Sequence, residues 1–203
     1  MKVTFSQLVI TAGICGILSF AFLATSIGTD YWYIIEINAM NTTDFENMSS
    51  HSGLWSITEG EKSSVFMDSF SADYSRYSAS EQRMLNMHGA IVVLLPLSLV
   101  LVLFGGICGL VSSLARSPVL LTAAASYFFI CSVLTVCGAS LYVVYSSQAE
   151  ALAGPESLAF VRTSFGWSFA LAWLSYGLEL LTGALLLAAA QLIRRRQSRP
   201  TRA

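Results

Sequence analysis

The sequence has few charged residues and too little polar surface for a soluble protein. Only 11% of its 203 residues are Asp, Glu, Lys or Arg, against roughly a quarter in an ordinary soluble domain, and 55% are hydrophobic. A soluble domain of this length needs a polar exterior, so we expect much of this surface to face lipid. The formal net charge of −1 provides no basic excess for nucleic-acid binding.

Residue patterns that would indicate catalysis or metal binding are also missing. His51 and His88 stand apart from any cysteine pair with zinc spacing, and there is no phosphate-binding glycine loop or nucleophile elbow. All four cysteines fall inside apolar runs, which excludes an extracellular disulfide. We therefore predict that the protein is not an enzyme and has no catalytic residue, cofactor, metal site, nucleic-acid partner or small-molecule substrate.

Four long apolar runs are present instead, at about residues 8–28, 89–114, 119–145 and 167–193. Each can cross a hydrocarbon core of about 30 Å, and helices satisfy the backbone hydrogen bonds of a lipid-exposed chain. The first run is alternatively a cleaved signal peptide, although it exceeds the usual length of such a hydrophobic core. The prediction is one domain over 1–203, an all-α membrane protein with a four-pass antiparallel transmembrane helix bundle.

The basic residues at the ends of these runs predict the orientation. One side of the membrane holds Lys2, Arg116 and the arginines of the tail 194–203, with no acidic residue among them. The other side holds the loops 29–88 and 146–165, and the first of these has nine acidic and three basic residues, a net charge of −6. The positive-inside rule places both termini in the cytosol and both loops outside a plasma membrane.

The first loop contains two strand candidates and two glycosylation sequons. Residues 31–37 and 53–58 are rich in aromatic and β-branched residues, which predicts a small extracellular antiparallel β-sheet. Asn41 and Asn47 each begin an Asn-x-Ser/Thr sequon between these strands, so we predict N-glycosylation there. The loop ends in a capping box, Ser78 to Glu81, which predicts that the second helix begins near Ala79.

Two features inside the apolar runs concern helix packing. Gly105 and Gly109 have Gly-x-x-x-Gly spacing, which indicates either packing within one bundle, the interpretation we favour, or a homodimer face. Pro96 is expected to bend the second helix.

Glu179 is the one ionisable residue well inside a run, and no basic residue is placed to pair with it. We expect its carboxyl group to be protonated, or to be hydrogen-bonded to hydroxyl groups of neighbouring helices. This makes it a structural contact rather than a proton or ion relay. Candidate hydroxyl groups are those of Ser19, Ser98, Ser132 and Thr135.

Trp32 is followed after a loop by Gly53-Leu54-Trp55. With this motif as its most specific element, the arrangement resembles the claudin, peripheral myelin protein and calcium-channel gamma-subunit superfamily over nearly the whole chain. The resemblance implies that these four residues form a structural extracellular anchor. The segment IGTDYWY resembles the gamma subunits that regulate glutamate receptors.

The chain departs from this superfamily where a pair of cysteines usually crosses the extracellular sheet. Thr58 and Ser64 occupy the positions where the resemblance implies those cysteines, so a bond that contributes about 2–4 kcal/mol is absent.

Two function classes follow from these features. The first is an interaction protein of cell–cell contacts or lateral membrane assemblies, with partners among itself, claudin-like relatives and membrane lipid. The second is an auxiliary subunit of a calcium channel or glutamate receptor, which the acidic first loop and IGTDYWY favour.

Overall fold

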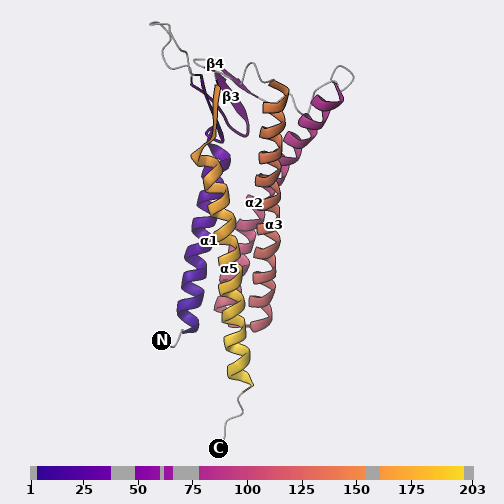
Figure 1. Ribbon diagram of the computed structural model, residues 1–203. Helices are drawn as coiled ribbons and strands as arrows, with labels where there is room; N and C mark the ends of the chain where they lie inside the picture. The colour runs from indigo at the N-terminus through magenta and orange to yellow at the C-terminus, as the bar shows by residue number, and fades with distance from the viewer. Residues whose placement is uncertain (1–3, 38–48, 60–61, 66–77, 154–160, 199–203) are drawn as a thin grey trace, which may run out of the picture. The chain divides into compact units, whose positions relative to one another are not determined.

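The computed structural model describes residues 4–37, 49–59, 62–65, 78–153 and 161–198. Within these ranges the chain forms four long helices and five short strands, in the order α1, β1 to β4, α2, α3, β5 and α5 (Figure 1). The predicted all-α membrane fold, four antiparallel helices with a small antiparallel sheet, is confirmed.

Each helix contains a segment that is long and apolar enough to cross a membrane. The helices are α1 (Phe5–Gly28), α2 (Ala79–Leu114), α3 (Pro118–Ala153) and α5 (Trp167–Gln197). As the capping box predicts, α2 begins at Ala79. It continues through Pro96 without interruption, and α3 runs eight residues beyond the predicted end at residue 145.

The sheet has five antiparallel strands in the order β4-β3-β2-β1-β5. Their bounds are β1 (Tyr33–Ile37), β2 (Ser49–Ser52), β3 (Ser56–Glu59), β4 (Lys62–Val65) and β5 (Val161–Phe165). The predicted strand over 53–58 is confirmed for its last three residues, which lie in β3, and wrong for its first three, which form the turn that joins β2 to β3. Three strands were not predicted: β2 and β4, which are short and rich in serine, and β5, which comes from the second loop.

The chain divides into two compact units. The helical unit contains Met1–Ala24, Leu97–Val136 and Trp173–Ala203, and the sheet unit contains Thr25–Pro96 and Cys137–Ala172. All five strands belong to the sheet unit, together with the segments of the four helices that adjoin them in the sequence.

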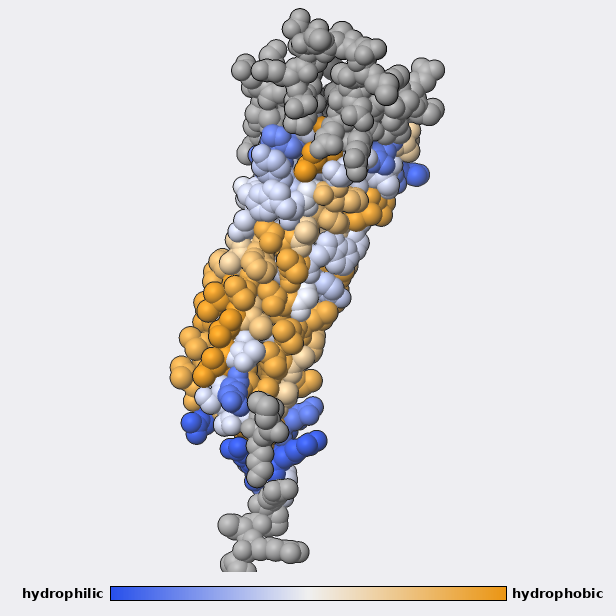
Figure 2. All heavy atoms as spheres, turned by 60° about the vertical axis from the view of Figure 1, so that its left-hand side comes forward, coloured by the Kyte–Doolittle hydropathy of each residue, from blue (hydrophilic) through white to orange (hydrophobic). Residues whose placement is uncertain are grey.

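Small and apolar side chains form the core of the helical unit. The buried cluster contains four alanines, together with larger residues such as Phe128 and Leu186, and the alanines let neighbouring backbones approach closely. Large hydrophobic side chains are also exposed, among them Ile17, Phe104 and Leu110. Figure 2 shows a broad hydrophobic surface along the helices. A hydrophobic surface of this extent is typical of helices that contact lipid.

Gly105 and Gly109 both lie against side chains of other helices in the same unit. A Cβ atom added at Gly105 would lie 2.9 Å from the ring of Tyr127, and one at Gly109 would lie 3.6 Å from Leu186. These contacts support packing within one bundle, whereas the homodimer role of this pair stays untested.

We expect Gly105→Leu to lower the free energy of unfolding by about 1–3 kcal/mol, because the new side chain has to displace the Tyr127 ring. Loss of helical circular dichroism on heating in detergent micelles measures the effect. Gly177→Leu is the matched control, since an added Cβ at Gly177 meets no heavy atom within 4 Å. Equal unfolding temperatures for the two variants would contradict the packing role.

Candidate functional site

Two tryptophan side chains bind the last carbonyl groups of α1. The indole N–H of Trp32 donates to the Ser26 carbonyl oxygen at 2.7 Å, and that of Trp55 donates to the Ile27 carbonyl oxygen at 2.9 Å. The last four carbonyls of a helix have no partner within the helix, so these bonds satisfy groups that would otherwise need water or another cap. Thr29 Oγ1 donates to the preceding carbonyl, that of Thr25, at 2.6 Å.

Trp32 also forms the centre of the aromatic core in the sheet unit. Its side chain is fully buried, with its ring centroid 4.8 Å from that of Tyr142 and 6.0 Å from that of Phe169. Its backbone joins both neighbouring strands, because its N–H donates to Ser52 and its carbonyl accepts from Gly166. Trp32 therefore links helix α1, the sheet, α3 and α5 within the sheet unit.

Gly53, Leu54 and Trp55 occupy the turn between β2 and β3. The N–H of Gly53 donates to the Ser56 carbonyl at 2.8 Å and closes the turn. A Cβ atom at Gly53 would lie 2.6 Å from the Cα of Asp30, so only glycine lets the turn approach the chain there. Leu54 is fully buried, and its carbonyl oxygen lies 3.2 Å from His88 Nε2.

The second loop contributes its strand through a close backbone approach. β5 pairs with β1, and Ser168 N–H donates to the Tyr31 carbonyl just beyond the end of this pairing. A Cβ at Gly166 would lie 1.9 Å from the Tyr31 carbonyl oxygen, which excludes any larger residue at this position.

A polar cluster connects the sheet to the end of α3. Tyr33 on β1 donates its hydroxyl hydrogen to Glu150, and Thr163 on β5 donates to the same carboxylate oxygen at 2.8 Å. Burial, together with the neighbouring Glu150 carboxylate, raises the pKa of Tyr33 to about 12. The phenol therefore remains a hydrogen-bond donor at physiological pH.

Several aromatic side chains of the sheet unit are partly exposed beside this anchor. Tyr31 and Trp55 are each 40% exposed, and Phe165 and Trp167 are each 47% exposed. Tyr31 stacks on His51 at 4.6 Å and on Trp167 at 5.8 Å, so these rings form a continuous surface. Aromatic groups of this kind are typical of membrane interfaces and of the centres of protein–protein contacts.

Glu179 lies at the centre of a hydrogen-bond network that includes all four helices of the helical unit. Its two carboxyl oxygens accept bonds of 3.0 Å from Thr135 on α3, and one of them accepts from Ser175 on α5 at 3.3 Å. Ser98 on α2 is 2.6 Å from the Thr135 hydroxyl, and Ser19 on α1 is 2.9 Å from the Ser175 hydroxyl.

Three of the four hydroxyl groups expected around Glu179 belong to this network: those of Ser19, Ser98 and Thr135. Ser132 instead donates to the Phe129 carbonyl of its own helix. Ser175 was not predicted, although it stands four residues before Glu179 and therefore on the same helix face.

The remaining predicted positions fall in the hairpin of β3 and β4 or outside the described residues. In that hairpin Thr58 pairs with Ser63 and Ser64 pairs with Ile57, so the two positions lie on adjacent strands without facing each other.

All four cysteines are free thiols, and Cys15 and Cys131 are buried. Asn41 and Asn47 lie outside the residues that the structure describes, so their glycosylation stays a prediction.

His88, Tyr33, Glu150 and Thr163 were not predicted as parts of this site. The pairs that they form join residues 13 to 117 positions apart, among them Leu54 with His88 and Tyr33 with Glu150. No local spacing indicates such contacts. Among the described residues, no group of three or more His, Cys, Asp or Glu side chains is placed to hold a metal ion.

A comparison with protein-family models identifies one matching family. The model described as PMP-22/EMP/MP20/Claudin tight junction matches residues 17–188. The matched range begins within α1 and ends within α5, and it includes Trp32, the Gly53–Trp55 turn and Glu179.

We expect Trp32→Phe to lower the free energy of unfolding by about 1–3 kcal/mol, because the Ser26 carbonyl loses its indole donor in a buried position. Thermal loss of helicity in micelles measures this change. Trp173→Phe is the control, since Trp173 lies in α5 and is 37% exposed. The capping role is wrong if both substitutions shift the transition equally.

Glu179→Leu should destabilise the protein by about 1–2 kcal/mol, because the bonds from Thr135 and Ser175 to the carboxyl group are lost. Glu179→Gln keeps an acceptor oxygen and should cost less than about 1 kcal/mol. Ser132→Ala serves as the control, because the Ser132 hydroxyl donates to the Phe129 carbonyl oxygen of the same helix, α3. Proton flux in liposomes that disappears in Glu179→Gln, with stability unchanged, would instead indicate a relay.

Proposed function

Because the chain belongs to the PMP-22/EMP/MP20/claudin family, we propose that it is a non-enzymatic, multi-pass plasma-membrane interaction protein. It acts at cell–cell contacts or in lateral assemblies within one membrane, and its partners are a second copy, claudin-like relatives and membrane lipid. Both termini lie in the cytosol, as the basic residues Lys2, Arg116 and Arg194–Arg196 favour. The sheet unit then carries the extracellular surface.

The observation that carries this proposal is the fixed attachment of the sheet to the end of α1. The bonds from Trp32 and Trp55 to the α1 carbonyls, and the Gly53 turn against Asp30, hold the strands in one position. A surface held in this way loses little conformational entropy when it binds a partner. Its outer strand β5 and the exposed rings of Tyr31 and Trp167 are available for such a contact.

An auxiliary role beside a channel or receptor is the second candidate. Within the family, SSHSGLW, LLPLSLVLVLFGGICGLVSSLA and SFGWSFALAW resemble transmembrane protein 235 and its relative transmembrane protein 114, whereas IGTDYWY resembles the receptor-regulating gamma subunits. The segment from Thr29 to His88 has a net charge of −6, which suits a basic partner and disfavours close homotypic stacking. A calcium channel or glutamate receptor is the partner class in this alternative.

A mixed culture of expressing and non-expressing cells tests contact across cells, the first form of the proposed function. We expect the tagged protein to be enriched where two expressing cells meet, because contact across the gap needs a copy on each side. Ser164→Glu, which adds a charge to the exposed outer strand β5, should lower this enrichment roughly five- to tenfold at normal surface delivery.

Ser80→Glu is the matched control, because Ser80 is an exposed serine in the first turn of α2, outside the candidate membrane spans. A uniform surface distribution of the unmutated protein would overturn contact across cells. Co-purification with a channel or receptor from the same membrane would then support the auxiliary role.

A further inference from the structure

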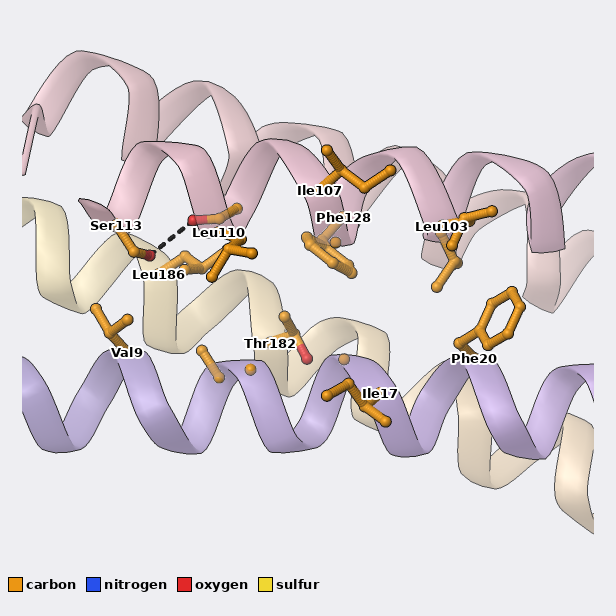
Figure 3. Close-up of a pocket in the computed structure, with 16 residues that line it drawn as sticks. Val9, Ile17, Phe20, Leu103, Ile107, Leu110, Ser113, Phe128, Thr182 and Leu186 are labelled. Carbon is orange, nitrogen blue, oxygen red and sulfur yellow. Dashed lines mark hydrogen bonds between the residues drawn. The ribbon is translucent and has the colours of Figure 1, made fainter. Parts of the chain in front are cut away.

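The helical unit contains an open apolar groove between α1 and α2 (Figure 3). It has a volume of about 320 Å³. Val9, Ile17 and Phe20 of α1 line one wall, and Leu103, Ile107 and Leu110 of α2 line the other (Figure 3). Phe128, Thr182 and Leu186 of α3 and α5 lie between these two walls.

Glycines form the open part of both walls. A Cβ atom added at Gly13 on α1 or at Gly106 on α2 would meet no heavy atom within 4 Å. Gly16 and Gly109 lie deeper, where an added Cβ would reach Phe128 at 3.7 and 3.9 Å. The space at Gly13 and Gly106 is therefore not filled by any described part of this chain.

The dimensions of the groove fit a lipid chain better than a protein helix. Its α1 wall extends from Val9 to Phe20, which at 1.5 Å per residue is about 16 Å along the helix. An α-helix with side chains is about 10 Å across and needs far more room than this groove offers. The helices that line the groove span the membrane, so the apolar groups next to its open side are extended acyl chains of lipids.

Positive charge gathers at one end of this groove. Ser113 is the last α2 residue that lines it, and the exposed Arg116 follows three residues later in the turn. Arg194, Arg195 and Arg196 are exposed in the last turn of α5. Glu179 is the only acidic residue in the sequence of the helical unit, and it is fully buried.

We propose that this groove binds one acyl chain of an anionic phospholipid, whose headgroup contacts the arginines at the ends of α2 and α5. A second copy of the chain does not fit this end, because its own arginines would repel those already there. The inference does not depend on whether the protein acts at cell contacts or beside a channel. In the proposed orientation, the headgroup lies in the cytoplasmic leaflet, where anionic lipids attract basic residues.

Native mass spectrometry of the detergent-purified protein tests the proposal with two lipids of identical acyl chains. We expect one dioleoyl phosphatidylserine per chain, bound at least about fivefold more tightly than dioleoyl phosphatidylcholine. Replacing Arg116 and Arg194–Arg196 with Gln should remove this preference and leave both lipids bound at the weaker level. Equal binding of both lipids to the unmutated protein would overturn the assignment of the headgroup.

Variants that fill the groove test the position of the acyl chain. Gly106→Leu and Gly13→Leu, on opposite walls, should each lower phosphatidylserine occupancy about tenfold or more. Gly177→Leu is the control, because it places the same side chain in open space outside the groove. Retained helicity shows that each variant folds. Loss of lipid from either variant alone is enough to support the position of the acyl chain.

The proposal is wrong if both filled variants bind lipid like the unmutated protein. It is also wrong if filling the groove converts a dimer to a monomer at unchanged lipid occupancy, because the occupant would then be a second copy.

Discussion

The end of α1 imposes the constraint that organises the sheet unit. A helix that stops at Gly28 leaves its last carbonyl groups without partners, and such groups are costly where water is scarce. Here the donors come from Trp32, directly after the helix, and from Trp55, in a turn between two strands. The same two side chains that satisfy α1 therefore also place β1 and the β2–β3 hairpin on it.

The helical unit meets the same requirement for buried polar groups in another way. Among the described residues of this unit, Thr135 on α3 and Ser175 on α5 donate to the Glu179 carboxyl group, and these two hydroxyls bond in turn with Ser98 on α2 and Ser19 on α1. Thr135 has one hydroxyl hydrogen but approaches four oxygen atoms, so a proton on Glu179 would supply a further donor to the network. Among the described residues, no buried polar side-chain atom lacks a hydrogen-bond partner.

The long elements could be predicted from the sequence because their signals are local. Apolar length predicts the four helices, and Ser78 to Glu81 predicts the start of α2. The predicted strand over 53–58 begins too early because Trp55 has strand propensity but occupies a turn, where tertiary contacts override it. Gly53 was recognised through the motif, yet the reason for a glycine, the 2.6 Å approach to Asp30 Cα, exists only in the folded chain.

The contacts of the Gly53–Trp55 turn also bear on the missing disulfide. The positions where the resemblance implies cysteines, Thr58 and Ser64, lie on β3 and β4, which are joined by backbone pairing. A disulfide would add about 2–4 kcal/mol, mainly by restricting the unfolded chain. The two indole bonds to α1 and the Leu54–His88 contact contribute about 1 kcal/mol each, a total of similar size, and they act in the folded state. The attachment of the sheet therefore relies on its hydrogen bonds to the helices, and within the sheet the outer strand β4 pairs with β3.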